Sequence, residues 1–212
     1  MKYPNLKIAI FILFSLTVIL SAQDMKRYDF KSGKVEYKLS GATTGTQTMF
    51  FDNYGMKEAK YADMSIDMMG MKQKKNTLSL LDGKDTYVVD WEKGTAVKMA
   101  TPLYNLFPKG KNLQHAGEKM MKNMGAEKTG TAKVLNKNCD VWEIKKAGMK
   151  MWMWESIPLK VEVNMMGMKM NQEATSVETD IKIPASKFEI PKNIKVTEMG
   201  AGAHGMKPPT KK

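Results

Sequence analysis

Short runs in which apolar and polar side chains alternate recur along most of this chain, and they constrain its fold more than any other feature. Val35, Tyr37 and Leu39 alternate with polar neighbours, as in a strand with one buried face and one wet face. Because strands this close together in sequence pair antiparallel, we predict a mainly β fold, α+β in class, built on one sheet. Similar runs are found at residues 46–51, 57–64, 76–81, 84–90, 95–99, 129–135, 139–145, 149–154, 159–166 and 168–179.

Two segments in the middle of the chain interrupt this pattern and predict short helices. Thr101 and Pro102 are typical of an N-cap and a first helical position, and apolar residues follow on one face up to residue 107. Apolar residues again take helical spacing in residues 112–124, and Gly125 ends that segment. We therefore predict a single curved antiparallel sheet, or half-barrel, whose concave side is covered by helices at 102–107 and 112–124.

The N-terminus predicts export. Two lysines precede an apolar run at residues 8–20, and small residues follow, as in a cleaved signal peptide. The run is shorter than the roughly 20 residues of a membrane-crossing helix, and no cysteine stands nearby for lipid attachment. We expect residues 1–22 to be removed, residues 23–199 to form one β domain, and residues 200–212 to be a disordered basic tail. The protein would then be periplasmic or secreted.

The formal net charge of +12 favours anionic partners. Export argues against nucleic acid, so an anionic membrane surface is the more natural candidate. A lysine-rich surface that only aids solubility is the alternative. The single cysteine, Cys139, lies in a strand-like segment beside Val141 and Trp142, and we expect it to be buried.

Motifs for catalysis are absent from the sequence. There is no G-x-S-x-G, no H-E-x-x-H, no phosphate-binding loop and no dinucleotide fingerprint. Two histidines, one of them near the C-terminus, leave little for acid–base or metal chemistry. We therefore expect a protein that is not an enzyme and has no cofactor.

Methionine is unusually abundant, with 21 residues in the chain. The string MMGMK occurs at residues 68–72 and again at 165–169, and GMK occurs five times. The apolar alternation changes phase at Gly70 and Gly167, which predicts β-bulges at these glycines. Three interpretations stay open: an adaptable hydrophobic core, the lining of a plastic apolar cavity, or thioether ligands for Cu(I).

The cavity interpretation assigns a set of lining residues on the strands and on the two predicted helices. They are Met68, Met149, Met151, Met153, Met166, Met168, Met170, Leu103, Phe107, Met120 and Met124. The metal interpretation requires the two MMGMK strings to lie close together. Its candidate ligands are Met68, Met69, Met71, Met165, Met166, Met168 and Met170.

Three segments carry a resemblance to a known family. They read EKTGTAKVLNKNCDVWEI, then MKMWMWES with IPLKVEV, and FEIPKNIKV near the C-terminus. With Gly130, Cys139, Trp142, Trp154, Phe188 and Pro191 in place, residues 24–199 resemble an uncharacterised bacterial envelope family, domain of unknown function 4412. That family is similar to the LolA and LolB lipoprotein carriers. The resemblance implies a half-open curved sheet lidded by helices, with a hollow that holds acyl chains in the carriers.

We therefore predict an exported binding protein that holds an apolar ligand, a lipid or a lipoprotein acyl chain, in a methionine-rich hollow. Burial of apolar area would drive binding. One alternative is soft-metal binding through clustered methionines. The other is a structural or interaction domain that has no small ligand.

Overall fold

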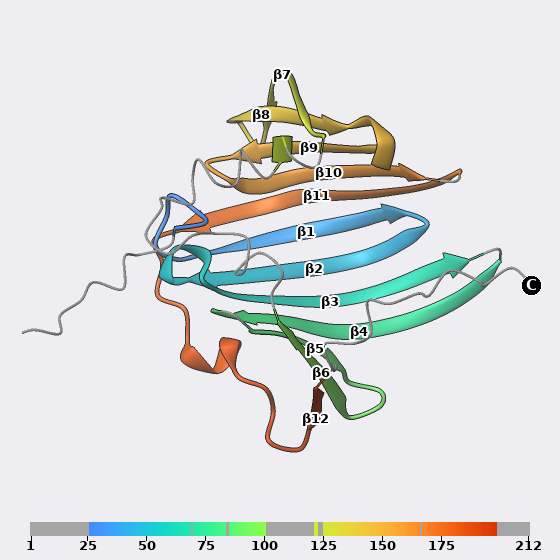
Figure 1. Cartoon of the computed structure of the whole chain (residues 1–212), viewed down its shortest axis with the longest axis vertical. Coiled ribbons are helices and arrows are strands. Elements are labelled where there is room, and N and C mark those ends of the chain that lie inside the picture. Colours follow the sequence, from blue (N-terminus) through green and yellow to red (C-terminus); the bar gives the residue numbers. More distant parts are fainter. Residues whose placement is uncertain are drawn as a thin grey trace, which may run out of the picture.

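The computed structural model describes residues 26–68, 70–83, 85–100, 121–122, 125–165 and 167–198. Within them the chain forms one open, curved sheet of twelve strands (Figure 1). The predicted mainly β class and single curved sheet are therefore confirmed. The strands are β1 (Gly33–Gly41), β2 (Thr43–Asp52), β3 (Lys57–Met68), β4 (Met71–Asp82), β5 (Asp85–Asp90), β6 (Thr95–Ala100), β7 (Glu127–Val134), β8 (Lys137–Ile144), β9 (Met149–Trp154), β10 (Ile157–Met165), β11 (Met168–Thr179) and β12 (Lys195–Glu198).

The sheet consists of two antiparallel meanders that meet in its middle. Strands β1 to β6 follow one another in order on one side, and β11 back to β7 follow on the other. β1 pairs with β11, so the first strand of the fold joins the two meanders. The short β12 adds to β6 as the one parallel pair among the described strands.

Helical structure in the described residues is limited to short elements. Three 3-10 turns are present, η1 (Asn53–Gly55), η2 (Lys145–Ala147) and η3 (Ala185–Phe188), and Met121 and Lys122 are also helical. Apart from those two residues, the predicted helices at 102–107 and 112–124 lie outside the described residues and stay predictions. The predicted signal peptide and tail also lie outside them. No described helix is both long enough and apolar enough to cross a membrane.

Both MMGMK strings form hairpin turns, and the predicted β-bulges at Gly70 and Gly167 are wrong. Met68 pairs with Met71, and Met165 pairs with Met168, so only two residues connect the strands of each hairpin. Gly70 and Gly167 have φ of 86° and 80°, a left-handed conformation that glycine adopts without steric cost. The change of phase in the sequence is therefore the reversal of the chain at each turn.

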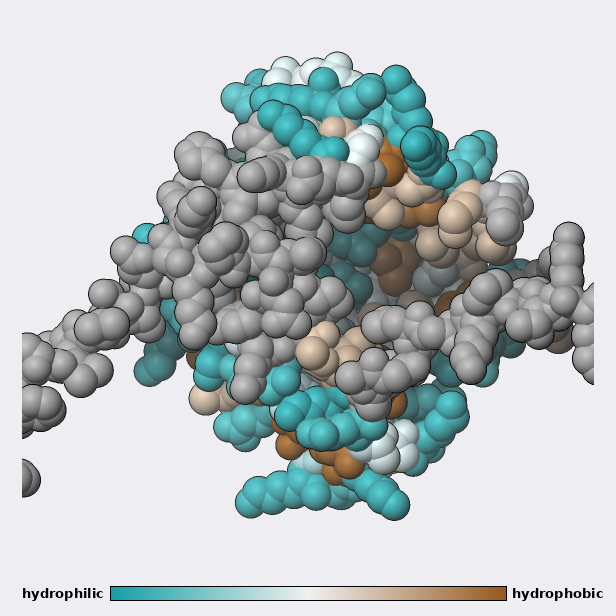
Figure 2. Space-filling model, viewed as in Figure 1, coloured by the Kyte–Doolittle hydropathy of each residue, from teal (hydrophilic) through white to brown (hydrophobic). Residues whose placement is uncertain are grey.

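The two faces of the sheet are packed differently. On the outer face of β3 to β6, Ala59, Leu78 and Val89 are buried beneath residues 188–194. The other face carries Leu39, Met64 and Val161, and we call it the hollow face. Figure 2 shows apolar side chains gathered near the centre of the molecule, where the surface is recessed, with hydrophilic side chains above and below.

Candidate functional site

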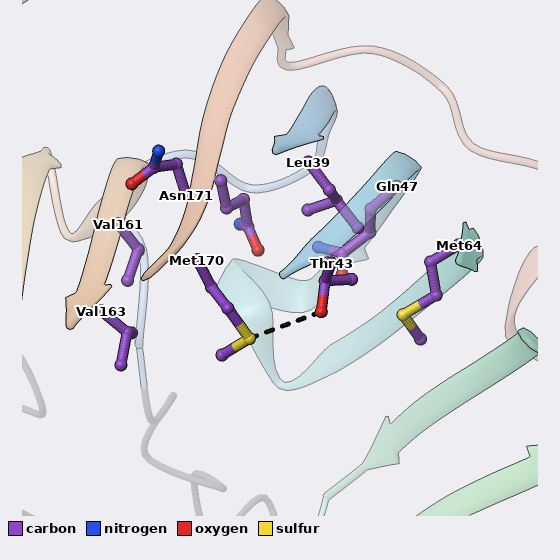
Figure 3. A pocket seen from close by; sticks show the side chains of 9 residues that line it. Leu39, Thr43, Gln47, Met64, Val161, Val163, Met170 and Asn171 are labelled. Carbon is purple, nitrogen blue, oxygen red and sulfur yellow. Dashed lines mark hydrogen bonds between the residues drawn. The ribbon is translucent and has the colours of Figure 1, made fainter. Parts of the chain in front are cut away.

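The hollow face carries a cavity of about 270 Å³. Five strands contribute to its wall, from β3 on one side to β10 on the other, which requires the sheet to curve around it (Figure 3). The lining residues are Leu39, Thr43, Gln47, Met64, Val161, Val163, Met170, Asn171 and Gln172. The register explains this grouping, because Val163 lies opposite Met170 and Leu39 lies opposite Gln172.

One end of the hollow face is filled by the protein's own side chains. Val35 and Tyr37 on β1 and Met49 and Phe51 on β2 are at most 2% exposed. Farther along the same face, Leu39 and most neighbouring lining residues are only partly buried, and Met170 is exposed. We call the filled end the inner end and the opposite end the tip end. The cavity therefore begins where this close packing stops.

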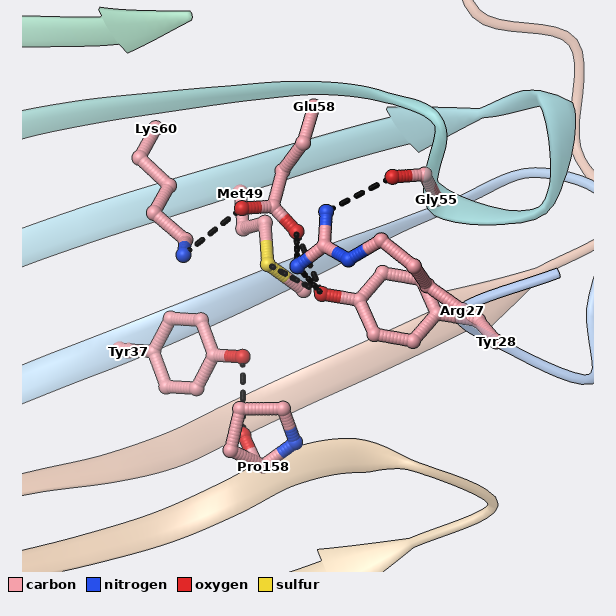
Figure 4. A network of polar contacts seen from close by, with 8 residues as sticks. All are labelled: Arg27, Tyr28, Tyr37, Met49, Gly55, Glu58, Lys60 and Pro158. Atoms are coloured by element: carbon pink, nitrogen blue, oxygen red, sulfur yellow. Dashed lines mark hydrogen bonds and ion pairs between the residues drawn. The ribbon is translucent and has the colours of Figure 1, made fainter. Parts of the chain in front are cut away.

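A hydrogen bond across a strand shows how tightly the inner end is closed. The hydroxyl of Tyr37 donates to the carbonyl oxygen of Pro158 over 2.9 Å, although β11 separates their strands in the sheet. This contact holds β1 and β10 together over the hollow face (Figure 4).

A buried polar network anchors the segment before β1 at the inner end (Figure 4). Glu58 of β3 faces the hollow and is buried, and its carboxylate accepts a hydrogen bond from the Tyr28 hydroxyl. The Lys60 Nζ lies 2.7 Å from one carboxylate oxygen, and the Arg27 Nη2 lies 3.4 Å from the other. Arg27 also donates to the carbonyl oxygen of Gly55 over 2.7 Å. Residues 27–28 are thus fastened over the closed end of the hollow.

Opposing effects set the pKa of Glu58. Burial alone would raise the pKa of this carboxyl, but the charges of Lys60 and Arg27 and hydrogen bonds from Lys60 and Tyr28 lower it to about 2. The same network raises the pKa of Tyr28 well above its ordinary value, chiefly through burial and next through the nearby carboxylate. Glu58 is therefore ionised at neutral pH and serves as an anchor.

The cavity wall is mostly apolar, and its polar groups are uncharged. Gln47 and Gln172 lie on either side of β1, on the hollow face, and neither amide has a hydrogen-bond partner among the described residues. Nearer the tip end, the Thr43 hydroxyl donates to the Met170 sulfur over 3.4 Å (Figure 3). Apolar walls with a few unpaired polar groups are typical of sites for small organic ligands.

The predicted lining residues have different positions in the structure. Met170 lines the cavity, and Met168 is exposed at the β10–β11 turn. Met149, Met151 and Met153 are partly buried against Trp142 and Ile144, in a cluster that also contains Met121 and Ala126. Only the backbone of Met68 is described. Leu103, Phe107, Met120, Met124 and Met166 lie outside the described residues.

Sequence reasoning missed most of the cavity wall. Leu39, Met64, Val161 and Val163 fall in runs that are predicted to be strands, but none of them is among the predicted lining residues. Their role depends on the pairing of β1 with β11, which joins residues about 130 positions apart and leaves no local signal. The one available signal was the alternation at Val161, Val163 and Met165, which places three apolar side chains on one face.

The metal interpretation receives no support for a site shared by the two MMGMK strings. The nearest strands of their hairpins, β3 and β11, are three positions apart in the sheet, which corresponds to about 14 Å. Lysines accompany both strings, and their charge disfavours a nearby cation. In the described part of the chain, no three His, Cys, Asp or Glu residues are grouped to hold a metal ion.

Cys139 is 1% exposed and free of any disulfide, as expected from its strand. Burial raises the pKa of its thiol. Cys139 thus has the properties of a small core residue.

Comparisons with known proteins establish the fold alone. An uncharacterised conserved protein from Thermus thermophilus aligns with a TM-score of 0.54 and 6% identity, over 83% of this chain and 95% of its own. Two further structures align with lower scores. MucB in the Pseudomonas aeruginosa MucA/MucB complex has a TM-score of 0.45 and 10% identity, over 78% of this chain and 58% of its own. The Mycobacterium tuberculosis lipoprotein LppX has a TM-score of 0.35 and 6% identity, over 74% of this chain and 91% of its own.

No family model and no curated protein sequence matches the chain. Membership of the uncharacterised envelope family therefore stays a prediction, whereas the open curved sheet that the resemblance implied is confirmed.

Proposed function

We propose that this protein is an exported carrier that binds the apolar chain of a lipid or lipoprotein in the cavity of its hollow face. One observation supports this above the others: among the described residues, the hollow is packed shut at its inner end and lies open, with a mainly apolar wall, toward its tip end. An elongated apolar ligand could enter from the tip end and stop against Tyr37 and Met49. The activity is binding, and no reaction is required of the residues around the cavity.

The size of the cavity limits what it can hold. Its volume of about 270 Å³ is near the lower limit for ligand pockets, roughly 300–1,000 Å³. A segment of one chain therefore fits better than several chains side by side. Each methylene removed from water contributes about 0.8 kcal/mol, so affinity should rise about fourfold per methylene until the cavity is full.

A chain-length series tests this proposal. Monoacylglycerols of increasing length would displace Nile red from the purified chain, with affinity rising stepwise and then levelling off. Val163→Trp would fill the cavity from β10 and weaken binding at least about tenfold. Asn164→Trp is the matched control, because Asn164 is the next residue of β10 and is exposed.

Two results would contradict the proposal. One is affinity that keeps rising with chain length without a plateau, as in non-specific adsorption. The other is equal loss of binding in both tryptophan variants. Absence of any binding would instead favour an interaction domain that has no small ligand.

A further inference from the structure

Three of the hairpins that turn at the tip end of the sheet border the cavity. They connect β1 to β2, β3 to β4 and β10 to β11, and the strand order places β1–β2 between the other two. Figure 1 shows the β3–β4 and β10–β11 turns projecting at the right of the sheet. The cavity lies toward this end, so the two MMGMK turns stand on either side of its opening.

Four methionines are exposed on these two hairpins. Met71 is 73% exposed, Met165 52%, Met168 47% and Met170 40%. Met165, Met168 and Met170 share the hollow face with Val163, as the register requires. Single exposed apolar side chains are ordinary on protein surfaces. Three of them on the β10–β11 hairpin, with Met71 across the opening, give both sides of the opening exposed apolar surface of the kind that marks an interaction site.

Lysines alternate with these methionines and point to the other face. Lys72 and Lys74 follow Met71 on β4, and Lys169 lies between Met168 and Met170 on β11; all three are exposed. None of these three has an ion pair within the described residues, whereas Lys34, Lys60 and Lys98 elsewhere on the sheet are paired with carboxylates.

The ends of the three hairpins that border the cavity have a net positive charge. Residues 40–44, 64–75 and 163–171 contain four lysines and one acidic residue, Asp67. The carboxylate of Asp67 accepts a hydrogen bond from the Gly70 amide over 2.9 Å, which stabilises the turn. The lysine charge therefore stays available to an anionic partner.

We propose that the tip end docks on the surface of an anionic lipid bilayer. The exposed thioether side chains would enter the boundary between headgroups and acyl chains, and Lys72, Lys74 and Lys169 would contact the anionic headgroups. Apolar and cationic side chains interleaved at one edge complement both layers of such an interface. This inference goes beyond the proposed function, because docking requires no ligand in the cavity, although it would turn the opening toward the lipid.

Vesicle sedimentation tests the docking surface. The purified chain should bind vesicles of equal parts phosphatidylglycerol and phosphatidylcholine, bind phosphatidylcholine vesicles far less, and dissociate as salt is raised. Replacing three lysines, K72Q/K74Q/K169Q, should weaken binding about 100-fold, since each lysine near an anionic surface contributes about fivefold. The variant K133Q/K192Q/K195Q removes the same charge from exposed positions on other parts of the chain, and should keep most of the affinity.

A second pair of variants tests the methionines. M71S/M168S should weaken vesicle binding at least about tenfold, because it removes apolar contact without changing charge. L135S/V196S is the control, since Leu135 and Val196 are also exposed but lie at the two edges of the sheet, by β7 and on β12, away from the cavity opening. A polarity-sensitive dye on M71C should shift its emission to the blue on vesicle binding, and a dye on V196C should not. The native Cys139 is buried and leaves the introduced cysteine as the reactive thiol.

Three results would overturn the proposal. The first is failure to bind the anionic vesicles. The second is an equal loss of binding in the tip variants and their controls, which would indicate attraction by total charge. The third is self-association without lipid that M71S/M168S abolishes, which would assign the patch to a second copy of the chain.

Discussion

Replacement of Glu58 by glutamine tests how the inner end of the hollow is closed. The variant keeps the shape of the side chain but removes the charge that pairs with Lys60 and Arg27. The pKa of Glu58 is lowered from 4.5 to about 2 in the folded protein. At about 1.4 kcal/mol per pKa unit, ionised Glu58 contributes about 3 kcal/mol to the free energy of unfolding at neutral pH. Removing one partner of a buried ion pair costs a similar amount.

The sign of the pH dependence follows from the lowered pKa. The contribution is fully present above the unfolded pKa of about 4.5 and is lost as pH falls toward the folded pKa of about 2. Urea unfolding across this range should therefore show a falling stability for the natural chain. The free energy of unfolding of Glu58→Gln should fall less over the same range, because this variant has no carboxyl at position 58 to become protonated. Trypsin should also cleave the variant faster after Arg27, because the segment is less firmly held.

Glu36→Gln is the matched control. Glu36 pairs with Lys34 over 2.6 Å and accepts a hydrogen bond from Ser176 over 2.9 Å, but its side chain is 43% exposed on the outer face, so loss of its charge should matter much less. The reasoning is refuted if the two variants have the same stability. It is also refuted if the stability of the natural chain stays flat between about pH 5 and pH 2.

Three further predictions concern other parts of the molecule. An ionised fatty acid should bind about as tightly as a monoacylglycerol of equal chain length, because the apolar chain fills the cavity while the headgroup stays in solvent at the open tip end; a fatty acid that binds about tenfold weaker in a displacement titration would contradict this. Gly41→Ala should lower the free energy of unfolding by about 1–3 kcal/mol, since φ at this position is 97° and the new Cβ would lie 2.1 Å from the Lys169 carbonyl oxygen. An unchanged urea midpoint would contradict this prediction. Cys139 should react with a maleimide only after unfolding, and immediate labelling of the folded chain would show that the thiol is accessible.

Local alternation predicted most strands, chiefly those with one buried face, although β7 was predicted too and only its last residue, Val134, is buried. It failed where both faces are wet: the first four residues of β4, Met71 to Lys74, are all exposed and give no periodic signal. The parallel strand β12 was missed for the same reason, since all four of its residues are exposed. The hairpins at Gly70 and Gly167 were mistaken for bulges because Met-Gly is not a typical turn pair.

The contacts that shape the site could not be read from the sequence. Glu58 follows Lys57 in a strand of alternating charges, which is typical of a surface, and only the return of Tyr28 across 30 positions buries it. The cavity wall depends on the pairing of β1 with β11 in the same way. Alternation assigns a residue to a face, but it does not determine which distant strand completes that face.

Native mass spectrometry of the chain, purified gently from a bacterial periplasm with lipid extraction of the same sample, tests the central proposal most directly. The account predicts a bound mass that matches an extracted acyl lipid, near one per chain, and that is lost in Val163→Trp but kept in Asn164→Trp. A bare chain mass in both the natural protein and the control, with no lipid in the extract, would contradict a carrier that binds its ligand in the hollow.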